Sequence, residues 1–181
     1  MKTSTRSLLL LIALCFCLPV AGNAAKKEIL DARIEAALEE LEALSPAARK
    51  LMKKAEGVLV FPNVKKAGMG IGGEFGEGAL LVDGEIERYY NTVSASVGLQ
   101  LGVQVKRQVL VFMDKGALAN FRGSKGFEIG VDGSVAVANL GAGGEIETKT
   151  LNQPVVAFIF GNKGLMYNLS LEGSKISPIK K

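Results

Sequence analysis

Four lysines flank one short apolar run, and their charge is the most direct chemistry that the sequence offers. Lys53 and Lys54 precede the run, and Lys65 and Lys66 follow it. Ammonium groups that gather on one surface attract anions, and salt screens this attraction where the groups face solvent. If the two elements that carry them pack side by side, the four lysines form one basic patch. The alternative is that each is a solvated lysine that protects a sheet edge from pairing with another chain.

A second candidate site is the polar face of segment 93–105, in which apolar and polar residues alternate strictly. This face presents Ser94, Ser96, Gln100 and Gln104, with glycines at the two positions between the last three. Small uncharged side chains leave room for a ligand, so these residues could line a cavity. They also allow a helix or a second sheet to approach closely, and the sequence leaves both interpretations open.

Several classes of chemistry lack the residues that they need. The chain has no histidine, which excludes Ser-His-Asp triads and histidine general bases. Its two cysteines, Cys15 and Cys17, lie in a segment that we expect to be removed, so zinc sites lack ligands as well. Asp83, Glu85 and Glu87 cluster at a predicted hairpin, where a turn and a solvated strand explain them better than acid–base or calcium chemistry. We therefore expect no enzymatic activity, no metal and no cofactor.

The first 24 residues have the composition of a secretory signal peptide. A basic start precedes an apolar run from Leu8 to Leu18, and small residues follow up to Ala24. The run is too short to span a bilayer as a helix, so we expect cleavage after Ala24. The prediction is an exported, periplasmic protein with one domain over residues 25–181, helical over 25–56 and mainly β over 57–181.

The overall charge is too balanced to indicate a nucleic acid partner. The chain has 22 basic and 18 acidic residues, and loss of Lys2 and Arg6 with the signal peptide leaves 20 basic ones. A nucleic-acid-binding domain generally shows a larger basic excess. A basic surface must therefore come from local clustering.

Two helices are predicted ahead of the β region. From Lys26 to Leu44, apolar residues recur every three or four positions and form one stripe, with an acidic face opposite. We expect the stripe to pack on the sheet, because helices that lie on membranes carry Lys and Arg on the polar face. The second helix starts at Ser45, a good N-cap followed by Pro46, and is predicted to run to Glu56 before Gly57.

Segment 57–82 carries glycine at almost every second or third position from Gly68 onward. So many glycines in a strand-like run predict tight curvature or a close backbone contact. Gly68, Gly70 and Gly73 fit the GxGxxG pattern of dinucleotide sites. That pattern requires a helix to follow, and here more strand follows, so we do not expect a nucleotide site.

Turn signals divide the remaining sequence into strands. Asp-Gly pairs at 83–84 and 132–133, and the segment 161–164, predict hairpins. A straight strand over 93–105 would span about 43 Å, so we expect it to bend at its glycines. The predicted fold is α+β, with N-terminal helices packed on a strongly curved antiparallel β-sheet that is either open or closed.

Four blocks of sequence, taken in order, resemble the SYLF domain family. They read GVLVFPNVKKAGMGIGGEFGEGALLV, YYNTVSASVGLQLGVQ, FEIGVDGSVAVANLGAGG and FIFGNKGLMYNLSLEGSKI. The resemblance covers about Ala47 to Ile176. Several separate blocks agree in order, so it is more specific than any single glycine motif.

The resemblance implies a lipid-binding domain without enzymatic activity, in a secreted bacterial member of the family. Eukaryotic members bind phosphoinositides, and some bind actin filaments. For this chain it implies an anionic lipid or a membrane surface as partner, with envelope proteins as further candidates. The lysines at 53, 54, 65 and 66 would then contact lipid headgroups. The alternative is a structural or protein-interaction module of the periplasm that has no lipid ligand.

Overall fold

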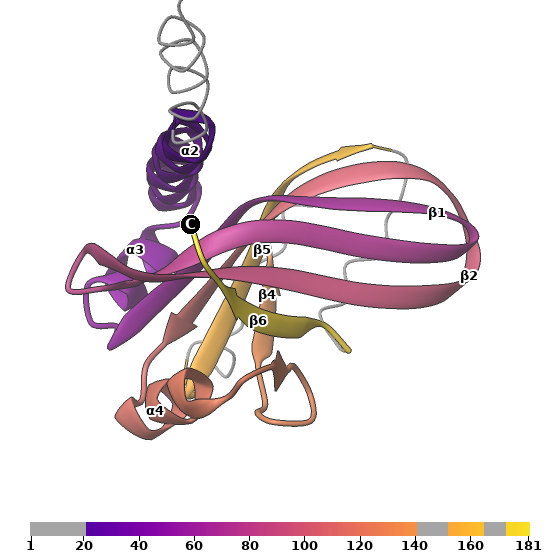
Figure 1. Ribbon diagram of the computed structural model, residues 1–181. Coiled ribbons are helices and arrows are strands. Elements are labelled where there is room, and N and C mark those ends of the chain that lie inside the picture. The colour runs from indigo at the N-terminus through magenta and orange to yellow at the C-terminus, as the bar shows by residue number, and fades with distance from the viewer. Residues whose placement is uncertain (1–20, 141–151, 165–172) are drawn as a thin grey trace, which may run out of the picture.

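The computed structural model describes residues 21–140, 152–164 and 173–181. Its helices are α2 (Ala21–Leu44), α3 (Pro46–Met52) and α4 (Lys115–Gly123), and its strands are β1 (Gly57–Val82), β2 (Glu85–Phe112), β3 (Phe127–Glu128), β4 (Ala136–Asn139), β5 (Val155–Gly164) and β6 (Lys175–Ile179). Figure 1 shows a curled sheet dominated by the long ribbon of β1 and β2, with α2 and α3 at one side. None of the described helices is long and apolar enough to cross a membrane.

Strands β1 and β2 form one long hairpin. They pair antiparallel from Gly57 opposite Phe112 to Val82 opposite Glu85. The turn between them is Asp83–Gly84, with φ angles of 52° and 83°. A two-residue turn with positive φ at both positions matches the twist of the flanking strands. The hairpin predicted at 83–84 is confirmed.

Strand β1 folds back on itself, so that its two halves touch. A Cβ atom at Gly78 would lie 1.9 Å from the carbonyl oxygen of Val60, and one at Gly76 would lie 2.9 Å from Cγ2 of Val64. The pairing register with β2 shifts between the two halves, at 69–71. The close backbone contact expected from the glycine-rich sequence is confirmed at these two glycines, where any larger residue would collide.

Strand β2 is the centre of the sheet. Its first half pairs with β6 and its second half with β5, both antiparallel. Strand β3 adds to β6, and β4 adds to β5 in the parallel direction, which gives the order β3-β6-β2-β5-β4 with β1 also on β2. The predicted strongly curved sheet with N-terminal helices is confirmed, and the parallel pair β4–β5 is the exception to its antiparallel pattern.

Two apolar cores lie on opposite faces of this sheet. Leu110 and Phe112 belong to the inner core, which the curl encloses together with Phe121 of α4. Val109 and Val111 belong to the outer core, which lies beneath the helices. Successive residues of a strand point to opposite faces, so each half of the ribbon contributes to both cores.

Helix α2 packs on the outer core by the stripe that the sequence predicts. Leu30, Ile34, Ala37 and Leu41 are buried, whereas Leu44 at the end of the stripe stays 52% exposed. The packing prediction for this helix is confirmed.

Helix α3 begins as predicted and ends earlier. The hydroxyl of Ser45 accepts a hydrogen bond of 3.1 Å from the amide of Ala48, which is an N-cap contact. The helix ends at Met52 rather than at Glu56. The reason is that the Glu56 amide donates to the carbonyl of Phe112 at 2.9 Å and so already belongs to the sheet.

Two other predicted hairpins are wrong. The strands on either side of 132–133 pair with β6 and β5, not with each other, and Asp132 closes a local loop by accepting a 2.7 Å hydrogen bond from the Glu128 amide. At 161–164, β5 continues as a strand. Gly161, with φ 63°, accommodates a register shift against β2 there, so its glycine serves a bulge rather than a turn.

Candidate functional site

The folding back of β1 brings two distant parts of the strand into one outer pocket. The pocket has a volume of about 150 Å³, and Leu30 and Arg33 of α2 line part of it. The first half of β1 contributes Lys65, and the second half contributes Phe75 and Glu77. A cation and an aromatic ring ten residues apart in sequence thus share one surface, because the strand reverses between them.

The positive charges of this pocket are available to a ligand. Arg33 and Lys65 are both exposed. Among the described residues, no carboxylate forms an ion pair with either of them. Glu77 at the pocket edge is already neutralised, since its carboxylate lies 2.8 Å from Nζ of Lys181. The pocket therefore presents two unpaired cations.

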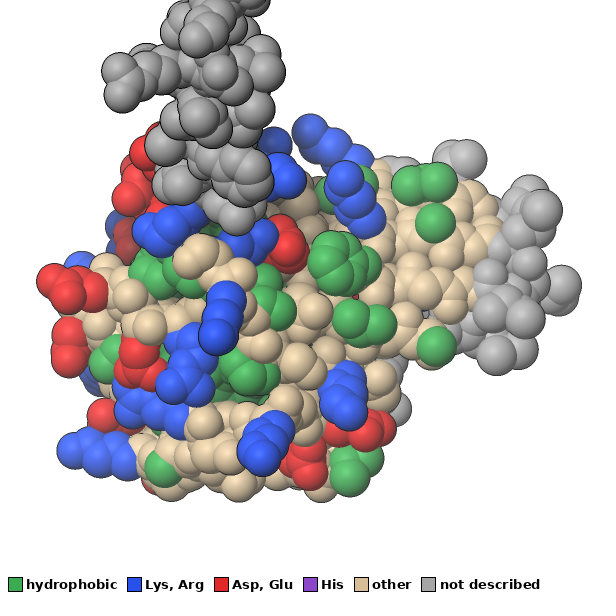
Figure 2. Space-filling model, viewed as in Figure 1, with side chains coloured by type: hydrophobic (Ala, Val, Ile, Leu, Met, Phe, Trp, Pro, Cys, Tyr) green, Lys and Arg blue, Asp and Glu red, His purple; other side chains and the backbone are tan. Residues whose placement is uncertain are grey.

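Apolar side chains continue this surface along the ribbon. Phe75 is 49% exposed and lies opposite Val93, 46% exposed, in the register of β1 and β2. Figure 2 shows hydrophobic side chains on the surface of the ribbon, with Lys and Arg side chains at their borders. We call Arg33, Lys65, Phe75 and Val93 the outer face. It combines positive charge with exposed apolar surface.

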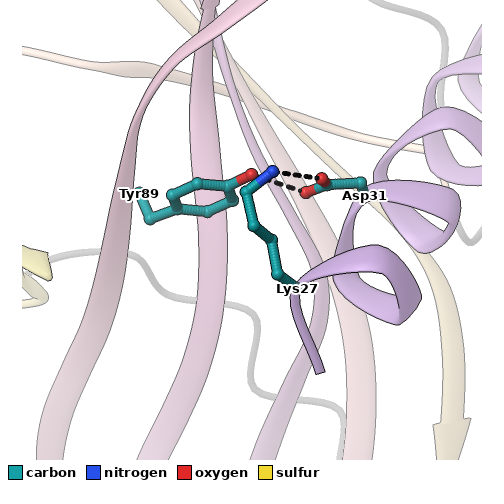
Figure 3. Close-up of polar contacts among 3 residues, drawn as sticks. All are labelled: Lys27, Asp31 and Tyr89. Atoms are coloured by element: carbon teal, nitrogen blue, oxygen red, sulfur yellow. Dashed lines mark hydrogen bonds and ion pairs between the residues drawn. The ribbon is translucent and has the colours of Figure 1, made fainter. Parts of the chain in front are cut away.

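Helix α2 is held beside the outer face by polar contacts at its first turns. The hydroxyl of Tyr89 donates to Oδ1 of Asp31 at 2.8 Å, and Nζ of Lys27 donates to Oδ2 of the same carboxylate at 3.2 Å (Figure 3). The Lys27 ammonium also lies 5.6 Å from the centre of the Tyr89 ring. Burial, followed by the hydrogen bond to Asp31, raises the pKa of Tyr89. These contacts fix the position of Arg33, half a turn further along the helix.

A second cluster of charges lies inside the curl of the sheet. Nζ of Lys66 lies 3.4 Å from Oε1 of Glu74, and Nζ of Lys106 lies 2.8 Å from Oε2 of the same carboxylate. The side chains of Lys66, Glu74 and Lys106 are 4%, 6% and 0% exposed. We call these three residues the inner polar cluster. It holds two cations and one anion away from water.

The contact of Lys106 with Glu74 has the distance of an ion pair but not the angles of a hydrogen bond. Among the described residues, its ammonium has no hydrogen-bond acceptor. Burial lowers the pKa of Lys106, and the neighbouring charge of Glu74 opposes this shift. A buried lysine loses its hydration, and a single ion pair compensates its charge only in part.

The structure does not bring the four lysines of the predicted patch together. Lys53 lines a separate pocket of about 310 Å³ near the β1–β2 turn, and Lys54 is exposed beside it. Lys65 belongs to the outer face, and Lys66 belongs to the inner polar cluster. Adjacent residues of a strand point to opposite faces, so Lys65 and Lys66 cannot share a surface. The role of the four lysines as ligands of lipid headgroups stays a prediction.

The residues predicted to line a cavity lie on the inner side of β2 as far as they are described. Ser94 is half-buried opposite Glu74, and Gln104 is 1% exposed opposite Lys66. The side chains of Ser96 and Gln100 lie outside the described residues. The polar face of this strand therefore points toward the inner polar cluster rather than toward a helix.

Sequence reasoning missed Arg33, Phe75, Glu74 and Lys106. A signal existed for Lys106, because the alternation that places Gln104 on the polar face also places residue 106 there. No local signal marks the other three, since Glu74 and Phe75 meet Lys66 and Lys65 through the reversal of β1, and Arg33 reaches Lys65 through the packing of α2. Spacing along the chain does not encode that contact.

Comparison with known families identifies the second half of the chain. Residues 93–181 match the family described as Ysc84, Las17-binding protein actin regulator. This segment belongs to the Ysc84 family. The Ysc84, or SYLF, family is known as a lipid-binding or actin-related domain and is a binding family rather than an enzymatic one. The resemblance to the SYLF family that the sequence blocks indicate is thereby confirmed. Comparison with curated proteins gave no match.

The Ysc84 segment contains part of each cluster. Val93 of the outer face and Lys106 of the inner polar cluster lie within it, whereas Lys65, Lys66 and Phe75 lie on β1, ahead of it. Because β1 pairs with β2 along its whole length, the matched segment needs the residues before it to complete its sheet.

Proposed function

We propose that this protein is a non-enzymatic domain that binds an anionic lipid surface through the outer face. The observation that supports this proposal is the shared pocket of Lys65 and Phe75 beneath Arg33. A membrane surface offers anionic headgroups above an apolar layer. A protein surface that pairs unpaired cations with exposed apolar side chains fits both layers.

The expected strength of this contact is modest. Each basic residue near an anionic membrane contributes on the order of 1 kcal/mol. Burial of exposed apolar side chains adds about 25 cal/mol for each Å² removed from water. Two cations and two apolar side chains therefore support weak, reversible binding, in which salt weakens the first contribution and spares the second.

We propose further that the protein acts at the bacterial envelope, after export and removal of residues 1–24. The basic start and the short apolar run support export. The lipid in that setting is an anionic phospholipid rather than a defined headgroup, because nothing on the outer face selects one headgroup geometry.

Flotation of the mature protein with vesicles tests the proposal. Vesicles of phosphatidylglycerol and phosphatidylcholine are compared with pure phosphatidylcholine at low and high salt. We expect binding to the anionic vesicles at low salt only. The double variant Arg33→Ala with Lys65→Ala should lose about tenfold or more in affinity, since it removes two membrane-facing charges. Phe75→Ser should weaken binding without changing its dependence on salt.

The matched control is the pair Lys53→Ala with Lys54→Ala. It removes the same net charge from a surface outside the outer face, so it should keep its vesicle binding within about threefold. Equal losses in the two double variants would show that net charge, not the outer face, governs binding. Absence of binding under every condition would contradict the lipid proposal and favour a structural or protein-interaction module.

A further inference from the structure

The interior of the β1–β2 ribbon changes character along its length. Near the turn and at the far ends of the two strands, the inner side is apolar and includes Leu80, Leu110 and Phe112. Toward the bend it becomes polar, with Lys66 opposite Gln104 and Glu74 opposite Ser94. Thr92, the preceding residue on the same face of β2 as Ser94, is buried as well. A polar interior costs free energy unless its groups find partners there.

The charges in this interior do not cancel. Of the described residues, Glu74 alone supplies negative charge to the ammonium groups of Lys66 and Lys106. One carboxylate shared by two lysines leaves a net charge of +1 in a region where all three side chains are at most 6% exposed. Buried charges in proteins are generally paired or bind ions.

One donor in this interior is also unused. The Lys106 ammonium is fully buried and has no hydrogen-bond acceptor among the described residues. The hydroxyls of Thr92 and Ser94 lie on the same inner side of β2. Ammonium and hydroxyl groups are among the donors that bind oxyanions in proteins.

We propose that the inner polar cluster binds one oxyanion of the phosphate type at the ammonium of Lys106, beside its contact with Glu74. A singly charged phosphate group would bring the net charge of the site to zero and would accept the hydrogen bonds that Lys106 does not make to Glu74. The phosphate is either a free ion or the headgroup of a lipid, since the same donors recognise both. This inference does not rest on membrane binding by the outer face, whose residues lie on the other side of β1.

Thermal unfolding of the full-length mature protein in sodium phosphate tests the inference, with sodium chloride at equal ionic strength as reference. Above the dissociation constant, the midpoint should rise by about 4 °C for each tenfold increase in phosphate, since only the folded protein holds the site. The variant Lys106→Met should lose this dependence. It leaves Lys66 and Glu74 as a neutral pair, so the interior keeps no unpaired charge.

Two further variants keep the test decisive. Lys54→Met is the control, because it removes the same charge at an exposed residue outside both the outer face and the inner polar cluster, and it should keep the phosphate response. Glu74→Gln removes the competing carboxylate, and it should respond to phosphate at about tenfold lower concentration. If Lys106→Met does not fold, the comparison of Glu74→Gln with Lys54→Met decides the question alone.

The results separate the two sources of phosphate and the two proposals. In the background of Arg33→Ala with Lys65→Ala, which removes the charges of the outer face, loss of the remaining flotation with phosphatidic acid vesicles on adding Lys106→Met would assign the site to a lipid headgroup, and unchanged flotation would assign it to free phosphate. Equal midpoints of the unmodified protein in phosphate and in chloride would overturn the inference. So would a response that Lys54→Met loses and Lys106→Met retains. Neither result would affect membrane binding by Arg33 and Phe75.

Discussion

At the scale of single residues, the fold depends on positions in β1 that leave no space for a side chain. Gly78 and Gly76 sit where the second half of β1 crosses the first, and the backbone of Val60 occupies the space that a Cβ of Gly78 would need. Gly73 in the same strand has only an ordinary contact, 3.6 Å from the carbonyl oxygen of Ser94. Gly76 and Gly78 therefore permit the reversal, whereas Gly73 tolerates replacement.

The variant Gly78→Ala should be strongly destabilised, because the new methyl group collides with backbone that cannot rotate away. Overpacking of this kind costs about 3 kcal/mol. Urea unfolding would measure the loss, and Gly73→Ala serves as the matched control with a change of less than about 0.5 kcal/mol. Equal stabilities of the two variants would mean that the halves of β1 do not touch.

At the scale of elements, α2 is attached to the sheet by both apolar and polar contacts. Its stripe lies on the outer core, and Asp31, near the middle of the helix, accepts a hydrogen bond of 2.8 Å from the hydroxyl of Tyr89. Further along, Glu40 accepts a hydrogen bond of 3.2 Å from Arg107 of β2. The pair of Arg107 and Glu40 is partly exposed and contributes little to stability. The contact between Asp31 and Tyr89 is therefore the main polar attachment of α2 to the sheet.

Replacing Tyr89 with Phe should cost about 1 to 2 kcal/mol, because it removes the hydrogen bond and leaves a partly buried carboxylate with Lys27 alone. Hydrogen exchange should increase in α2 more than in β5. If α2 exchanges no faster in the variant, the hydroxyl does not anchor the helix.

The same variant changes the dependence of stability on pH. The pKa of Tyr89 is raised in the folded protein, so the neutral hydroxyl is favoured there. Stability from this group is therefore present below the ordinary tyrosine pKa of about 10 and is lost as pH rises through the folded value. As the pH rises from about 10 to 12, the free energy of unfolding should therefore fall less in Tyr89→Phe than in the unmodified protein.

At the scale of the whole molecule, the ribbon separates two kinds of interior. One end of the curl encloses an apolar core of Phe61, Phe112 and Phe121, and the other holds the charges of Lys66, Glu74 and Lys106. Stability should come mainly from the first region. The second region contributes little to stability, which is why we assign it to binding.

Export should leave this arrangement intact. Cleavage after Ala24 would remove the first turn of α2 and would leave every described side-chain contact of that helix in place, since these begin at Lys27. Expressed in a bacterial host, the protein should therefore appear in the periplasm with Ala25 as its first residue, and N-terminal sequencing would establish this. An uncleaved chain that begins at Met1 would contradict the signal-peptide prediction.

Much of the local structure could be predicted from the sequence. Asp83 and Gly84 give a turn with two positive φ angles, Ser45 caps a helix, and the stripe that includes Ile34 and Leu41 packs α2 on the sheet. These features depend on residues that are neighbours in the chain. The same local reasoning was wrong at 132–133 and 161–164, because pairing with β6, β5 and β2 overrides the turn preference there.

The candidate site was predicted less well, for a geometric reason. Alternation assigned Ser94 and Gln104 to one face of a strand, but it could not show that Lys66 and Glu74 lie on the facing part of β1. Nor could it show that Phe75 meets Lys65, since that contact requires the strand to reverse.

The sequence by itself determined the family, the two N-terminal helices, the long β1–β2 hairpin and the presence of a strand with one polar and one apolar face. These follow from periodicity, capping and turn chemistry, which act over a few residues. Only the tertiary structure decided which face points inward, that Lys65 and Lys66 belong to different surfaces, and that Lys106 joins Lys66 around Glu74. Such contacts arise when the ribbon folds back on itself, and the energy of that closure depends on packing between segments far apart in the chain.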